Sequence, residues 1–138
     1  MPRPLRKLAP SEREALTRVR RAVASFRDVE ETITFGNPTF KTRGQSFAVL
    51  DMYAGRECLW LQVPADERAE LLRLPGWFAS PYDPQHRALC CELKEFDWRR
   101  IGTRLRISYG LIHNKDQRRS YRPKRKATIP NRTASTRD

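Results

Sequence analysis

Two stretches of the chain carry apolar side chains at the spacing of an amphipathic helix. In the first stretch they recur at i, i+3, i+7 and i+10, on a face made by Leu16, Val19, Val23 and Phe26. Ser11 precedes this stretch and Glu14 follows three residues later, which is the spacing of a capping box. The pattern therefore predicts a helix from about Glu12 to Phe26, with Ser11 as its N-cap residue.

The second helical stretch lies further along the chain and begins after Asp97, a residue type that caps helix N-termini well. Its apolar face is made by Trp98, Ile101, Leu105, Tyr109 and Ile112. The periodicity stops after His113, so the helix is predicted to end there. A shorter helix is predicted from Pro64 to Leu74, because proline suits a first helical turn and the following Pro-Gly pair ends the pattern.

Between the two long helices, apolar and polar positions alternate with the period of two that is typical of strands. Turn sequences divide this region into strands at about residues 39–42, 46–52 and 57–63, and a further strand is expected at residues 87–93. Residues 28–34 are interpreted as a connection into the sheet. Residues 77–84, which are rich in aromatic side chains and proline, are interpreted as a loop or an irregular strand.

Alternation also assigns the faces of the predicted sheet. Leu59, Leu61 and Val63 are expected to face the core. The strand at 46–52 is ambiguous, because both of its faces are largely apolar. If its alternate residues Ala48 and Leu50 face inward, the aromatic residues on the outer face are Phe47, Tyr53 and Trp60.

These patterns predict an α+β fold: an antiparallel β-sheet of four to six short strands with helices packed on one face. At 138 residues the chain is long enough for one modest core. We expect a basic N-terminal extension at residues 1–10, a single domain at 11–114 and a disordered basic C-terminal tail at 115–138. No run of about 18 apolar residues is present and the N-terminus lacks an apolar signal core, so a soluble, cytoplasmic protein with no membrane partner is expected.

The net charge of +12 is concentrated at the two ends of the chain. Residues 1–27 carry eight Lys or Arg and two Glu, and residues 115–138 carry nine Lys or Arg and two Asp, whereas acidic and basic residues nearly balance between them. This distribution favours a polyanionic partner such as nucleic acid. A basic tail is also an ordinary solubilising appendage, and that alternative stays open.

No catalytic, metal-binding or phosphate-binding motif stands out in the sequence. The three cysteines, Cys58, Cys90 and Cys91, lack CxxC spacing, so neither a disulfide framework nor a zinc site is indicated. The two histidines, His86 and His113, belong to no recognisable triad or metal motif, and the glycines form no P-loop or dinucleotide fingerprint. We therefore expect a protein that is not an enzyme and that uses no metal or cofactor.

Across about residues 25–112 the chain resembles the MmcQ/YjbR family of small bacterial α+β proteins. The resemblance rests on these residues: Val29-Glu30; Gly36, Pro38 and Phe40 in GNPTF; Gly44 with Phe47-Ala48-Val49-Leu50; Pro64 with Leu71-Leu72; and Phe78, Pro81, Tyr82 and Leu93. It implies a sheet with helices on one face, similar to the frataxin-like arrangement, and a double-wing DNA-binding motif. The chain departs from the family at Arg27-Asp28, where members usually have Pro-Gly, and at Gln85-His86-Arg87-Ala88, where a Gly and a Trp are usual.

The leading functional hypothesis is a nucleic-acid-binding protein that contacts mainly phosphates and is largely independent of sequence. The side chains expected to contact DNA or RNA are Arg13, Arg20, Arg21, Lys41, Arg43, Arg118, Arg119, Arg122, Lys124, Arg125 and Lys126. Lys41 and Arg43 would act as a wing at a groove. The sequence does not reveal the oligomeric state, and a monomer is favoured.

The alternative hypothesis belongs to another class: a module that binds a partner protein or a small ligand and does not bind nucleic acid. Its surface would be made either by the sheet face that bears Phe47, Tyr53 and Trp60, or by the loop from Trp77 to Tyr82. An exposed aromatic patch of either kind is typical of an interaction site.

Overall fold

The computed structural model describes residues 3–81, 83 and 87–121, and it describes the backbone alone for residues 115–121. The elements in chain order are α1 (Pro10–Val23), β1 (Val29–Thr34), β2 (Asn37–Thr42), β3 (Gln45–Tyr53), β4 (Arg56–Gln62), the 3-10 turn η1 (Ala65–Glu67), α2 (Arg68–Leu71), β5 (Trp77–Ala79), β6 (Ala88–Glu92), η2 (Trp98–Arg100) and α3 (Ile101–Tyr121). The six strands form one antiparallel sheet in the order β1-β2-β3-β4-β6-β5. The α+β fold class is therefore confirmed.

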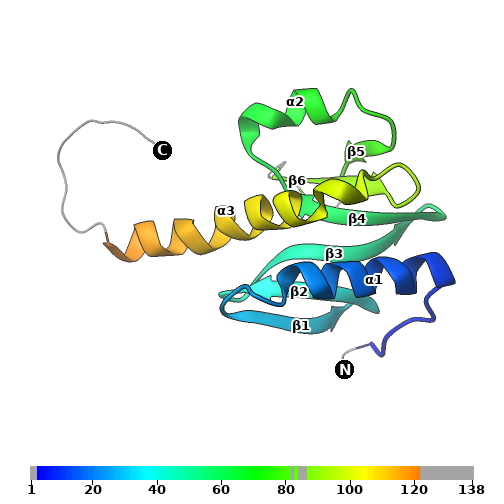
Figure 1. The fold of residues 1–138 in the computed structure, drawn as a ribbon, viewed down its shortest axis with the longest axis horizontal. Coiled ribbons are helices and arrows are strands. Elements are labelled where there is room, and N and C mark those ends of the chain that lie inside the picture. The colour runs from blue at the N-terminus through cyan, green and yellow to red at the C-terminus, as the bar shows by residue number, and fades with distance from the viewer. Residues whose placement is uncertain (1–2, 82, 84–86, 122–138) are drawn as a thin grey trace.

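Both long helices lie on the same face of the sheet, where they enclose the core (Figure 1). As predicted, α1 buries Leu16, Val19 and Val23 against the sheet, whereas Phe26 lies just past its end and is partly buried. Helix α3 crosses β3 and β4 beside α1 and buries Leu105 and Ile112. Because one face of a six-stranded sheet is wider than a single helix, two helices are needed to remove its apolar side chains from water.

The first helix begins earlier than predicted, and Ser11 is not its N-cap. Ala9 takes that position, with Pro10 in the first turn. The carboxylate of Glu12 is 1% exposed; it accepts hydrogen bonds from the backbone N–H of Ala9 (3.0 Å) and from both terminal nitrogens of Arg6 (3.1 and 2.6 Å). The Ser11 hydroxyl donates to Glu57 on β4. With Ala9 as the N-cap, Glu12 rather than Glu14 is the capping carboxylate, and the partly buried Arg6 holds it in place.

Residues 1–10 are predicted to be an N-terminal extension, but the described part of this segment contacts the domain from Arg3 onwards. Leu8 is buried in the core. Arg6 donates its backbone N–H to the Gly36 carbonyl (2.9 Å) and its Nε to the Asn37 side chain (2.6 Å), so it joins the start of α1 to the β1–β2 turn. Residues 3–9 are thus part of the fold.

The structure corrects the assignment of Phe47 to the outer face. Phe40 pairs with Ala48 but Lys41 pairs with Ser46, so Phe47 is an extra residue in β3, a β-bulge. The bulge lets Phe47 and Ala48 both point to the helix side, where Phe47 is fully buried and packs on Phe26 and Tyr109. Simple alternation could not predict this, because a bulge shifts the period by one residue.

Ser108 of α3 satisfies the backbone groups that the bulge leaves without ladder partners. Its hydroxyl donates to the carbonyl of Phe47 (2.5 Å) and accepts from the backbone N–H of Gln62 on β4 (2.9 Å). The side chain of Gln62 also donates to the carbonyl of Ser46 (3.1 Å). A helix hydroxyl thus takes the place of a ladder hydrogen bond between β3 and β4.

Other elements differ from the sequence predictions in extent. Residues 28–34, expected as a connection, contain the edge strand β1. Its sequence is mostly polar because the strand pairs on one side only, so the apolar alternation that predicts a strand is weak. The helix predicted from Pro64 to Leu74 is reduced to η1 and the single turn α2. Helix α3 continues to Tyr121 instead of ending near His113, and residues 122–138 of the predicted tail lie outside the described residues.

We predict that Ser108→Ala destabilises the protein by about 2–3 kcal/mol, because it leaves a buried carbonyl and a buried N–H unpaired. The measurement is the free energy of unfolding in urea. Thr103→Ala removes a hydroxyl from an exposed position of the same helix and should change this free energy by less than about 0.5 kcal/mol. Equal effects of the two substitutions would contradict the bridging role of Ser108.

Candidate nucleic-acid interface

Three segments that are distant in sequence meet at one end of the sheet. The pairing of Val29 with Thr42 places the α1–β1 connection beside the β2–β3 turn. The Tyr109 hydroxyl of α3 donates to the carbonyl of Arg27 in that connection (2.7 Å). Beyond this point, the C-terminal half of α3 projects past the end of the sheet (Figure 1).

This end of the molecule, which we call the basic end, carries cationic side chains from each segment, all of them exposed except Lys41, which is partly buried. Its members are Arg21 and Arg27 from the end of α1 and the connection after it, Lys41 and Arg43 from β2 and the turn, and Arg106 from α3. Arg106 lies over the ring of Phe26, with 5.8 Å from its guanidinium carbon to the ring centroid. The nearby acidic residues are Asp28 and Glu30, so the positive charge predominates.

An aromatic cluster fixes the elements that present these charges. The rings of Phe26 and Tyr109 lie 4.8 Å apart, and those of Phe47 and Tyr109 lie 5.5 Å apart edge to face. Such contacts add specific geometry to the burial of apolar surface. The end of α1, the bulge of β3 and the middle of α3 are therefore held together beneath the basic end.

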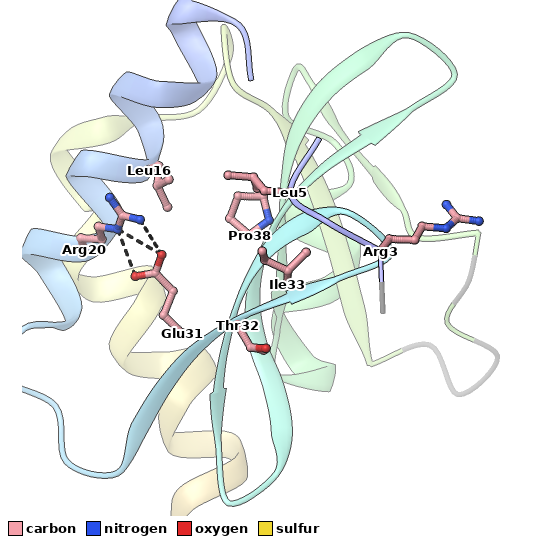
Figure 2. A pocket seen from close by; sticks show the side chains of 8 residues that line it. All are labelled: Arg3, Leu5, Leu16, Arg20, Glu31, Thr32, Ile33 and Pro38. Carbon is pink, nitrogen blue, oxygen red and sulfur yellow. Dashed lines mark hydrogen bonds and ion pairs between the residues drawn. The ribbon is translucent and has the colours of Figure 1, made fainter. Parts of the chain in front are cut away.

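The structure gathers only some of the cationic residues that the sequence analysis selected. Arg21, Lys41 and Arg43 lie at the basic end, but Arg13 lies near the start of α1 and donates to the carbonyl of Leu8 (2.8 Å). Arg20 forms a bidentate ion pair with Glu31 of β1, with the closest N–O distance 2.6 Å, so its charge is largely compensated (Figure 2).

The basic residues selected beyond residue 114 are only partly described. Arg118 and Arg119 belong to the part of α3 that is described by its backbone alone. Arg122, Lys124, Arg125 and Lys126 lie outside the described residues. Sequence reasoning missed Arg27 and Arg106 as members of the basic end. The available signal was the recurrence of arginine every seven residues at 13, 20 and 27, but the helix ends before Arg27, which lies in the connection beside the β2–β3 turn.

The five aromatic residues of the alternative hypothesis do not form one surface. Phe47 is in the core, and Trp77 faces the helices and packs on Phe96. Tyr53 and Trp60 lie on the opposite face of the sheet, as predicted, while Tyr82 lies outside the described residues. Of the sheet face predicted to bear Phe47, Tyr53 and Trp60, the structure therefore keeps Tyr53 and Trp60 and moves Phe47 to the core.

The part of the chain that the structure describes also contains no group of three or more His, Cys, Asp or Glu side chains placed to hold a metal ion. None of its helices is long and apolar enough to cross a membrane.

Comparisons with protein-family models, curated proteins and solved structures yield no match to this chain.

The three cysteines are buried free thiols. Hydrogen bonding to Cys90, together with burial, raises the pKa of the Cys58 thiol far above its usual value. Burial, with the neighbouring carboxylates of Glu92 and Glu95, raises the pKa of Cys91 to about 12. Because the thiolate is the reactive form, these groups are poor nucleophiles at neutral pH.

We predict that the native protein reacts very slowly with a thiol reagent such as DTNB at pH 8. A thiol with a pKa of about 12 is ionised about a thousandfold less at this pH than a free cysteine with a pKa of about 8.5. Reaction in 8 M urea supplies the control and should modify all three cysteines within minutes. Rapid modification of any thiol in the folded state would contradict the burial described above.

Proposed function

We propose that this protein binds nucleic acid through its basic end, without catalysing a reaction on it. The observation that carries the proposal is the convergence of three separate segments, each bringing exposed arginine or lysine to one end of the sheet. A cluster of this kind attracts phosphates and releases their condensed counterions. The resemblance to the MmcQ/YjbR family implies DNA binding and leads to the same proposal.

The distribution of ion pairs supports this location over the rest of the surface. Many cationic side chains elsewhere have an acidic partner: Arg6 with Glu12, Arg20 with Glu31, Arg56 with Glu92 and Arg104 with Glu67. At the basic end, Arg21 and Arg27 have no ion-pair partner among the described residues. Their charges remain available to phosphate oxygens.

In this proposal the β2–β3 turn acts as the wing. The turn is a two-residue hairpin in which Arg43 and Gly44 both have positive φ (51° and 78°), which is the geometry of a type I′ turn. This short, regular hairpin holds Arg43 at the tip of the wing. The projecting half of α3 continues from the same end into the basic sequence that follows residue 114, so both elements can follow one nucleic-acid backbone.

The proposed contacts are to phosphates, so we expect little preference for base sequence. The cations at the basic end are Arg and Lys, and Gln45, directly after the β2–β3 turn, is the amide side chain nearest to Arg43 in the sequence. Duplex DNA and RNA are both acceptable partners for such a surface. Binding to nucleic acid also fits the cytoplasmic location expected from the sequence.

The test is the affinity for a labelled DNA duplex, measured by fluorescence anisotropy across a salt series. The full chain is expected to give a log-affinity against log-salt slope of about −4 to −5, corresponding to roughly five neutralised phosphates. A triple variant with Arg21→Gln, Arg27→Gln and Arg43→Gln should make this slope shallower by about 2–3 and weaken binding at low salt.

The control replaces two exposed cations at the opposite end of the molecule, each of which forms an ion pair: Lys94 with Glu92 and Arg99 with Asp97. Lys94 and Arg99 are 78% and 91% exposed, and Lys94→Gln with Arg99→Gln should leave the slope within about 0.5 of the full chain's value. A chain ending at Asn114 separates the domain from the sequence after it. If this shorter chain loses all binding, the sequence after residue 114 is a generic polycation and the basic end has another role.

A further inference from the structure

Strand β1 is an edge of the sheet, and half of its backbone hydrogen-bonding groups point away from β2. The β1–β2 hairpin has a two-residue turn, so Thr34 and Asn37 form a hydrogen-bonded pair, and the inward groups belong to residues 30, 32 and 34. The N–H and C=O groups of Val29, Glu31 and Ile33 therefore point outward. Among the described residues nothing is hydrogen-bonded to them, so the edge is open to a further strand.

A cleft of about 440 Å³ runs beside this edge, between β1 and α1. Its apolar walls come from four side chains drawn around the opening in Figure 2, namely Leu5, Leu16, Ile33 and Pro38. The Arg20–Glu31 ion pair lies at one side of the cleft, and Arg3 lies at the other. Leu5 and Ile33 are 46% and 40% exposed, so apolar surface remains in contact with water here.

Phe35, at the tip of the same hairpin, combines exposure with an unfavourable backbone conformation. Its side chain is 76% exposed, with the guanidinium carbon of Arg3 5.9 Å from the ring centroid. Its φ of 52° is a left-handed conformation that costs a bulky residue about 1 kcal/mol or more. Asparagine would suit this turn position better. An exposed aromatic residue held in a strained conformation points to a role in binding rather than in folding.

We propose that the β1 edge is a docking site for an extended peptide of a partner protein, which adds a seventh strand to the sheet. The peptide would carry an aliphatic side chain for the cleft, flanked by acidic residues on the same face. Backbone hydrogen bonds to residues 29, 31 and 33 would provide affinity, and the cleft and Phe35 would provide selectivity. This surface adjoins the basic end at Val29 but presents backbone groups and an apolar cleft instead of cations, and it does not depend on the proposed nucleic-acid binding.

The charge of the surrounding helix flank favours an acidic peptide. Arg13 and Arg20 lie seven residues apart in α1, which places them in a row along the helix flank that overlooks β1, and Arg3 lies at the other side of the cleft. A strand added to β1 would pass beneath this row, and only Arg20 is compensated, by Glu31. A second copy of this chain is disfavoured as the occupant, because pairing through its own β1 would bring an identical basic row against the first.

The test uses the full chain and a fluorescein-labelled peptide, Thr-Glu-Thr-Ile-Thr-Glu-Thr, in an anisotropy titration. Alternate residues place the isoleucine and both glutamates on one face. We expect saturable binding with a Kd below about 1 mM, weakened about tenfold when both glutamates are replaced by lysine. Two further peptides carry methyl groups on their backbone nitrogens, one at peptide positions 2, 4 and 6 and the other at positions 1, 3, 5 and 7. Only one of the two should lose binding, because alternate amides of an added strand face β1.

Two substitutions at equivalent hairpin tips separate binding from folding. Phe35→Asn removes the aromatic ring while suiting the type I′ turn, so it should weaken peptide binding about tenfold without lowering the melting temperature. Ala54→Asn makes the same kind of change at the β3–β4 turn, where Ala54 has a φ of 53°, and should leave peptide binding unchanged.

A third substitution tests the backbone contacts. Ile33→Pro removes an outward N–H without removing a hydrogen bond to β2, and it should abolish peptide binding.

Several outcomes would overturn the proposal. Absence of binding up to 1 mM peptide would do so, as would equal effects of the two methylation sets. Dimerisation of the chain in sedimentation experiments, abolished by Ile33→Pro, would assign the edge to a second copy. If Ile33→Pro or Phe35→Asn reduced DNA affinity instead of peptide affinity, the edge would belong to a nucleic-acid surface.

Discussion

The hydroxyl of Ser108 is the interaction on which the arrangement of this protein depends. It stands between β3 and β4, giving a hydrogen bond to Phe47 and receiving one from Gln62. Without it, the bulge in β3 would leave two backbone groups unpaired in the core. Because the bulge turns Phe47 to the helix side, that ring meets Phe26 and Tyr109. The Tyr109 hydroxyl then holds the connection after α1, and so the position of the cationic residues around it.

A second buried polar interaction organises the opposite end. Glu12 accepts three hydrogen bonds and is almost completely buried, so the fold at this point requires the guanidinium of Arg6. A buried carboxylate without its partner would be strongly destabilising. The same arginine contacts the β1–β2 turn. It therefore positions the N-terminal segment that carries Arg3 and Leu5 to the cleft beside β1.

These two interactions give the molecule two surfaces of different chemistry. The basic end presents arginine and lysine from three segments, suited to a flexible polyanion that is recognised by charge. The β1 edge presents unpaired backbone groups and an apolar cleft, suited to an extended chain that is recognised by hydrogen bonding and shape. Long-range charge falls off within about 8 Å at physiological salt. The two surfaces adjoin where β1 begins beside the β2–β3 turn, so a peptide bound near Val29 would lie close to the cations of the basic end.

The sequence by itself determined the elements whose periodicity is regular. It predicted the buried faces of α1 and α3, the inward leucines of β4 and the α+β class, because local spacing and burial agree there. It could not predict β1, because this mostly polar strand pairs only with β2 and lacks apolar alternation. It also could not predict the inward position of Phe47. Those features depend on an extra residue in β3 and on a serine 61 positions away. The same holds for the candidate sites. Charge at the chain ends was evident, but only the tertiary structure brought Glu31 to Arg20 and placed the connection that carries Arg27 beside the β2–β3 turn.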